Sequence, residues 1–192
     1  MVSLLRTIRL DPSDGILFAP AAAPGEWAVP GSFIFQGRDL ATLERKERVA
    51  FRSAFLGVDS FGFSTLAVVT RVSPAERAQA VEALAMALVR HFGAPDVDIA
   101  SPAAEEEIAF AEELARGHEE GRLIALHREE DETGQIRERF RALRPREQTP
   151  WADPALAGHE RPFHFLMTDT PDEAIEEEFD LLASVRQDES RT

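Results

Sequence analysis

The sequence predicts an α+β fold, in which a mixed or mostly antiparallel sheet packs against about four helices. Two capping boxes, Ser73 with Glu76 and Thr170 with Glu173, each precede a helical pattern of apolar residues. Segments with strand character lie near both ends of the chain, and one pair of them has the pattern of a hairpin. Strands and helices do not alternate regularly, which argues against a doubly wound nucleotide-binding fold.

The length and composition fit one domain. The chain has 192 residues, of which 44% are hydrophobic, and domains typically hold about 100–200 residues. We expect a single α+β domain over residues 1–186 and a frayed tail over 187–192. No internal repeat is present.

The N-terminal third is expected to hold three strands and one helix. The strands are predicted at 3–10, at 16–18, reversing against the first after the turn at 11–15, and at 27–35, with a bulge or edge position at Pro30-Gly31. The helix is predicted from Asp39 to about Phe55, with Gly57 at its end.

The middle of the chain has the clearest local patterns. Residues 61–72 are apolar on both faces, which predicts a central strand. A helix should run from the Ser73 capping box to Phe92 and end at Gly93, and another should begin at Ser101-Pro102.

The C-terminal part predicts a hairpin, an irregular connection and a last helix. The hairpin arms are placed at 122–128 and 135–143, with Gly134 in a left-handed turn position. Residues 144–158 should be irregular, 163–167 a short strand, and a helix should follow the Thr170 capping box.

Composition excludes several classes of function. The chain has no cysteine, so it has no disulfide, thiolate nucleophile or sulfur-based metal site. Neither a signal peptide nor the ~20-residue apolar run of a membrane span is present, which predicts a cytoplasmic protein without membrane contact. A net charge of −14 argues against nucleic acid as the partner.

The loop at 57–65 is the first candidate site. Asp59, Ser60, Gly62 and Ser64 lie between a predicted helix end and a predicted buried strand, where backbone amides can receive an anionic or amide-bearing ligand. The loop matches neither the dinucleotide-binding nor the P-loop fingerprint. The favoured alternative is a tight structural turn that needs its glycines for space.

The second candidate site is a row of arginines in the second hairpin arm. Arg137, Arg139 and Arg141 occur at a spacing of two, which places them on one face of a strand, and Arg144 and Arg146 follow. Such a row can bind a carboxylate, a phosphate or an acidic partner surface. The favoured alternative is ion pairing within the fold or at an interface.

Other clusters are expected to have no chemical role. His159 and His164 have no spacing typical of a metal site, and we predict neither a metal nor a cofactor. The glutamate runs at 105–107 and 176–178 are expected to be solvated early turns of helices.

Four stretches resemble an uncharacterised family of small alphaproteobacterial proteins, classed as a domain of unknown function. They are TIRLDPSD at 7–14, GEWAV at 25–29, FRSAFLG at 51–57 with SFG at 60–62, and AEEEIAF at 104–110. The resemblance extends to about Glu147. It implies a bacterial cytoplasmic protein, favours an accessory role slightly, and brings no activity or catalytic residue.

These observations lead to three functional hypotheses. The leading one is a non-catalytic binding or accessory protein, expected to be a homodimer, that recognises a protein partner or a small anionic ligand. Its contact surfaces would be the arginine row and the 57–65 loop. The alternatives are a small enzyme whose active site lies in the loop, with a histidine supplied from elsewhere, and a structural subunit of an oligomer.

Overall fold

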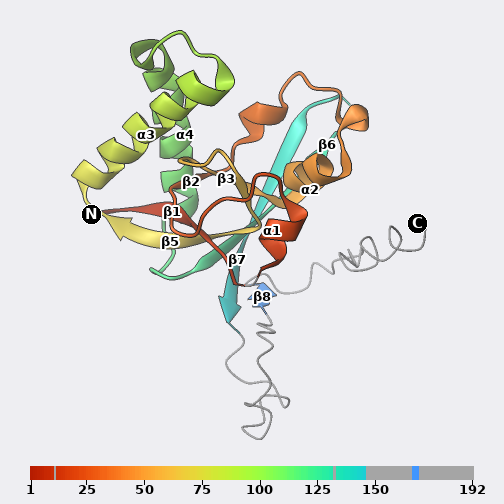
Figure 1. Ribbon diagram of the computed structural model, residues 1–192. Coiled ribbons are helices and arrows are strands. Elements are labelled where there is room, and N and C mark those ends of the chain that lie inside the picture. The colour runs from red at the N-terminus through yellow and green to blue at the C-terminus, as the bar shows by residue number, and fades with distance from the viewer. Residues whose placement is uncertain (11, 132, 146–165, 169–192) are drawn as a thin grey trace, which may run out of the picture.

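The computed structural model describes residues 1–10, 12–131, 133–145 and 166–168, and it confirms the α+β class (Figure 1). The named strands pair antiparallel in a five-stranded sheet of order β1-β5-β6-β7-β8 and a three-stranded sheet of order β2-β3-β4. The strands are β1 Val2–Ile8, β2 Ala28–Val29, β3 Phe55–Gly57, β4 Phe63–Ser64, β5 Leu66–Val72, β6 Leu123–Glu130, β7 Ile136–Pro145 and β8 Leu166–Thr168. The helices are α1 Ser13–Leu17, α2 Arg45–Ser53, α3 Pro74–Phe92 and α4 Val97–Ala115, with two 3-10 turns, η1 Ser32–Phe35 and η2 Leu40–Thr42.

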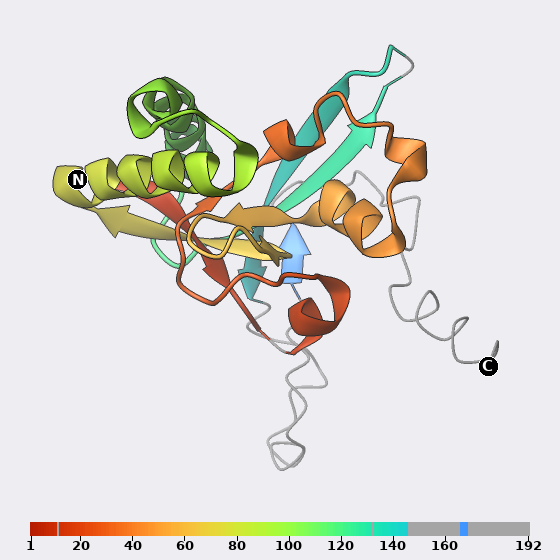
Figure 2. The same cartoon turned by 45° about the horizontal axis from the view of Figure 1, so that its top comes forward.

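Helices α3 and α4 pack against each other, and α4 lies against β1 (Figures 1 and 2). Helix α3 begins and ends as predicted: Ser73 and Glu76 form the capping box, and Gly93 is the left-handed C-cap with φ of 80°. Arg77 joins the two helices through ion pairs of 2.7 Å to Glu105 and 2.7 Å to Glu112.

Helix α4 begins earlier than predicted. Asp96 is its N-cap and accepts a hydrogen bond from the Ile99 amide, so that Ser101 and Pro102 lie inside the helix. The Ser101 hydroxyl donates to the Val97 carbonyl instead of capping. The glutamates at 105–107 therefore do not lie in the first turn, and the expectation based on the helix dipole was wrong for them.

The predicted helix over 39–55 is divided into two. Asp39 caps only η2, Leu43 is extended, and a second capping box of Glu44 with Glu47 begins α2. Helix α2 ends before Ala54, and Gly57 belongs to strand β3 rather than to a helix cap. A local cap in the middle of the segment thus decided the helix start.

Two predictions near the N-terminus were wrong. Residues 16–17 belong to helix α1, and β1 pairs with β5, from Val2 opposite Val72 to Ile8 opposite Leu66. In the predicted strand 27–35 Ala28 and Val29 form strand β2, and Trp27 makes an isolated antiparallel bridge with Arg6. The strand ends there because Pro30 lacks an amide donor and Gly31 turns the chain with φ of 73°. A Cβ on Gly31 would lie 2.7 Å from the Leu56 Cβ.

The predicted central strand and hairpin are present. Strand β5 lies between β1 and β6. The early part of the predicted strand forms the separate short strand β4 instead, and the two strands are divided at Thr65. The hairpin of β6 and β7 has Gly134 at φ of 78° in its turn. Strand β8 overlaps the strand predicted at 163–167. The predictions for 146–165 and 169–192, including the Thr170 helix and the tail, lie outside the described residues.

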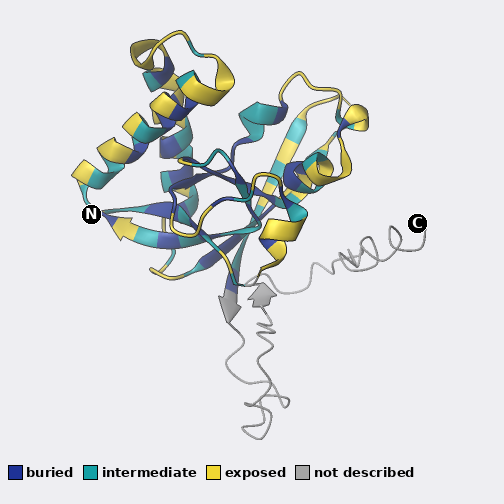
Figure 3. Cartoon of the chain, viewed as in Figure 1, coloured by how far each residue is buried: buried dark blue, intermediate teal, exposed yellow. Residues whose placement is uncertain are grey.

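Two apolar clusters form the interior (Figure 3). The larger one joins the five-stranded sheet to α3, α4 and strand β3, and includes Leu5, Phe55 and Ile108. The smaller one lies beneath α2 and includes Phe35 and Phe51, whose rings meet edge to face at 5.3 Å. The α2 cluster is next to the hairpin, so both candidate regions rest on packed cores.

Candidate functional site

The polar groups of the 57–65 loop bind buried carboxylates of the same chain. Both the amide and the hydroxyl of Ser60 donate to Oε2 of Glu26, at 2.8 and 2.9 Å. Glu26 is only 7% exposed, and its Oε1 accepts from the Ala23 amide at 2.6 Å. Gly57 has no side chain to occupy this space, since a Cβ there would lie 2.7 Å from Glu26 Oε2. Glu26 therefore joins the loop to the segment before β2.

A second buried carboxylate holds the other end of the loop. Asp14 of helix α1 accepts from the Thr65 hydroxyl at 2.6 Å and from the Ser64 hydroxyl at 3.4 Å. Ser64 is buried and also donates to the carbonyls of Ile8 and Leu66. These contacts fix the break between β4 and β5 and tie helix α1 to it.

The remaining loop residues differ in environment. Gly62 lies against backbone, because a Cβ there would be 2.7 Å from the Ala21 carbonyl carbon. Asp59 is exposed. The structure thus brings Ser60, Gly62 and Ser64 into internal contacts, and Asp59 into solvent.

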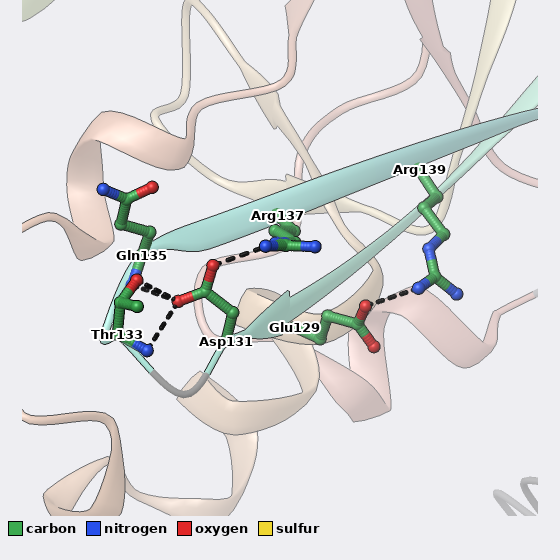
Figure 4. A network of polar contacts seen from close by, with 6 residues as sticks. All are labelled: Glu129, Asp131, Thr133, Gln135, Arg137 and Arg139. Atoms are coloured by element: carbon green, nitrogen blue, oxygen red, sulfur yellow. Dashed lines mark hydrogen bonds and ion pairs between the residues drawn. The ribbon is translucent and has the colours of Figure 1, made fainter.

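The arginines of β7 lie on the outer face of the hairpin, as their spacing predicts. Arg137 and Arg139 have side chains that are 66% and 62% exposed. Arg137 pairs with Asp131 at 2.9 Å, and Arg139 pairs with Glu129 at 2.6 Å (Figure 4). Their partners come from the hairpin itself and not from the acidic helices. We call the side chains of Arg137, Arg139 and Arg141 the arginine face.

The turn of the hairpin is organised by Asp131. Its carboxylate accepts from the hydroxyl and amide of Thr133 and from the Gln135 amide (Figure 4). These bonds, with the Thr133 hydroxyl contributing most, hold the pKa of Asp131 well below its usual range. Arg141 is half-buried and makes no hydrogen bond or ion pair with the described part of the chain.

The inner face of the same hairpin holds an arginine that the sequence did not single out. Arg128 is 1% exposed and pairs with Glu138, its cross-strand neighbour, at 2.7 Å. Its guanidinium also donates to the carbonyls of Phe51 and Ala54 at the end of α2, and to that of Pro30. Burial lowers the pKa of Arg128, while the charge of Glu138 opposes that shift.

A carboxylate from α4 completes this inner cluster. Glu107 is half-buried and lies at helical spacing from the buried residues Ala104, Ile108 and Ala111 of α4, a spacing that could have identified it in the sequence. Its Oε2 atom is buried and has no hydrogen-bond partner in the described structure. Burial and the nearby charge of Glu138 raise the pKa of Glu107 to about 7, whereas the Gly31 amide and Arg128 act to lower it.

A cleft of about 710 Å³ lies between the hairpin tip and the segment 32–40. Phe35, Asp39, Glu130 and Glu138 are part of its lining, and neither the arginine face nor the 57–65 loop contributes to it. Three carboxylates and one cation, Arg38, line this cleft, and one of the carboxylates, Glu138, is paired with Arg128. Across the described ranges, no group of three His, Asp or Glu side chains is arranged to hold a metal ion. The described helices include none long and apolar enough to span a membrane.

Comparison with known proteins gives a family but no activity. No curated protein and no solved structure matches the chain. A family model described as "Family of unknown function (DUF6505)" matches residues 1–157, which include both candidate regions. The chain therefore belongs to the family of unknown function DUF6505.

Proposed function

We propose that this protein is a non-catalytic binding or accessory protein that recognises an acidic surface of a protein partner through its arginine face. The observation that carries the proposal is the exposure of Arg137 and Arg139, both more than 60% exposed, in a chain of net charge −14. Their ion pairs lie at the surface, where such pairs contribute little free energy and exchange readily with other carboxylates. Arg141 adds a guanidinium without a partner among the described residues.

The surroundings favour a protein over a small anion. The cleft between the hairpin tip and segment 32–40 does not include the arginine face, and its lining has more acidic than basic side chains. Small ligands usually need a concave site that buries most of their surface. An open face with three arginines at a spacing of two instead suits an extended acidic surface, which can pair with each guanidinium in turn.

The internal contacts of the 57–65 loop weigh against the enzyme alternative. A nucleophilic serine needs an accessible hydroxyl and a nearby base. Ser60 and Ser64 both face carboxylates, but Glu26 and Asp14 are buried and use their oxygens to fix the backbone. This arrangement favours a structural role for Ser60, Gly62 and Ser64.

We also propose a homodimer and a bacterial cytoplasmic location. Phe92, Val97 and Ile99 are exposed where α3 gives way to α4, and Ile99 is 60% exposed. A second copy could cover these side chains. Sedimentation of the native chain and of Ile99→Asp tests this: a dimer that Ile99→Asp dissociates supports it, and a monomeric native chain rejects it. The location rests on the family resemblance.

The arginine face can be tested by capture of partners from native bacterial cytosol. Arg139→Glu/Arg141→Glu should reduce capture of any specific partner by about tenfold or more, because reversal of charges in an interface converts attraction to repulsion. Arg137→Glu/Arg139→Glu, which changes only exposed side chains, guards against misfolding of the first variant. Quantitative mass spectrometry of the captured proteins provides the measurement.

Two controls separate the loss of a specific contact from the effects of changed net charge and of lowered stability. Arg48→Glu/Arg116→Glu makes the same change in net charge at exposed positions outside the hairpin and should leave capture unchanged. Ser60→Ala should lower the melting temperature without affecting capture. If both hairpin variants still capture the partner as the native chain does, the arginine face is not the recognition surface. Loss of capture in Ser60→Ala alone would instead favour the loop.

A further inference from the structure

The arginine face continues into an apolar row across the sheet. Ile8 lies opposite Leu66, Leu66 opposite Ala125, and Ala125 opposite Arg141, so these four residues form one line over β1, β5, β6 and β7. All four are half-buried. The outer face therefore offers an apolar strip that ends at Arg141, next to the exposed Arg139.

Strand β8 lies at the edge of the sheet, next to β7. Strand β8 pairs antiparallel with the end of β7, with Leu166 opposite Pro145 and Thr168 opposite Leu143. Its last residue, Thr168, therefore lies opposite Leu143, which is two residues from Arg141 along β7. Beyond Leu143, the described residues supply no further strand partner for this edge of β7. The described part of β8 thus ends about two residues from the arginine face.

That segment has the complementary charge. Its first part, 169–180, reads DTPDEAIEEEFD and contains seven carboxylates and no basic residue. Ile175 and Phe179 lie among these acids at a spacing of four. An acidic stretch with two apolar side chains matches a surface that joins arginines to an apolar strip.

We propose that residues 169–186 of the chain dock on the arginine face in cis and thereby regulate its access to the acidic partner. The regulatory consequence rests on the proposed function. The docking itself is argued only from the register of β8 and from the opposite charges of the segment and the arginine face. Individually weak surface pairs become effective here because the short connection from Thr168 makes binding intramolecular. The partner must then displace the chain's own acidic segment.

Docking can be measured by a distance in the full chain. The absence of native cysteine allows His127→Cys, exposed beside Arg139 on the outer face, and Ser184→Cys to be spin-labelled without other changes. We expect a narrow, short distance distribution at low salt that broadens as ionic strength rises. A distance seen only between differently labelled chains would place the segment on a second copy and overturn docking in cis.

Exchanging the charges of the arginine face and of the acidic segment tests whether this face is the docking surface. Arg137→Glu/Arg139→Glu should broaden the distribution, and adding Glu176→Arg/Glu177→Arg/Glu178→Arg should restore it. The matched control, Arg48→Glu/Arg116→Glu, should leave the distribution narrow. A distribution that is broad in the native chain, or that stays narrow when the hairpin arginines are reversed, overturns the proposal.

A binding assay separates this inference from the proposed function. The probe is an oligoglutamate peptide, measured by fluorescence anisotropy against the native chain and Glu176→Gln/Glu177→Gln/Glu178→Gln. If the docked form is about 90% populated, the neutralised variant should bind about tenfold more tightly. Equal binding by both chains would refute docking but preserve the arginine face as a site. Failure of both to bind, with a narrow distance distribution, would refute partner recognition but preserve docking.

Discussion

The two faces of the β6–β7 hairpin hold the same kind of ion pair in opposite environments. On the inner face, Arg128 and Glu138 are cross-strand neighbours, and the Arg128 side chain has no exposed surface. On the outer face, Arg139 and Glu129 meet at a similar distance, but Arg139 is 62% exposed. Water screens the outer pair, whereas the inner pair is shielded from water and its two side chains keep the same partners. The same kind of ion pair is thus buried within the fold on one face and open to solvent on the other.

The largest effect is expected for Arg128→Met. Removal of the guanidinium leaves Glu138 partly buried without its cation, and the carbonyls of Phe51 and Ala54 lose a donor. Breaking a buried pair in this way typically costs about 3–5 kcal/mol. Denaturant unfolding of Arg128→Met and of Arg128→Met/Glu138→Leu provides the measurement. A loss below about 1 kcal/mol would show that the inner pair contributes no more than a surface pair.

An intermediate effect, dependent on pH, is expected from Glu107. Its folded-state pKa of about 7 is above the ordinary value of 4.5, so the native state binds the proton more tightly than the unfolded state. The free energy of unfolding should therefore decrease as pH rises from about 4.5 to 7, by roughly 2–3 kcal/mol in total.

Glu107→Gln provides the comparison. The amide keeps an acceptor for the Gly31 backbone and removes the charge, so the variant should be more stable than the native chain at pH 8 and similar to it at pH 5. Thermal unfolding across this range gives the measurement. Parallel pH profiles for the two chains would show that Glu107 does not titrate in this window.

The smallest effect is expected on the outer face. Arg139→Ala removes an exposed pair with Glu129 and should change the free energy of unfolding by no more than about 0.5 kcal/mol. High salt should abolish even this difference. Denaturant unfolding at low and high salt measures it. A loss comparable to that of Arg128→Met would remove the distinction between the two faces.

Helix ends and side-chain directions were predictable from the sequence where neighbouring residues alone determine them. The Ser73 box, Pro74 and Gly93 specify both ends of α3 without help from the rest of the fold, and the spacing of Arg137, Arg139 and Arg141 places them on one outward face. Asp96 and Glu44 were missed as caps because stronger-looking signals stood nearby at Ser101 and Asp39.

Long-range partners were not predictable in this way. Ser60 and Ser64 look like ligand-binding groups until Glu26 and Asp14, which are 34 and 50 residues away, are placed beside them. Alternation with Ile124 and Leu126 could have assigned Arg128 to the inner face, but nothing local indicates that it meets α2. The same holds for Glu107, whose stripe position was visible and whose charged neighbours were not.

The reach of Arg128 also has a consequence for how the fold opens. One guanidinium holds carbonyls at the end of α2, the carbonyl of Pro30 and a carboxylate of β7, and the most distant of these groups is 98 residues from Arg128 in the sequence. The hairpin cannot separate from α2 without exposing all of these groups together. We therefore expect amide protons of α2 and of the hairpin to exchange with solvent as one cooperative unit, distinct from the α3–α4 pair. If this exchange pattern is found, a single side chain sets the boundary of a folding unit.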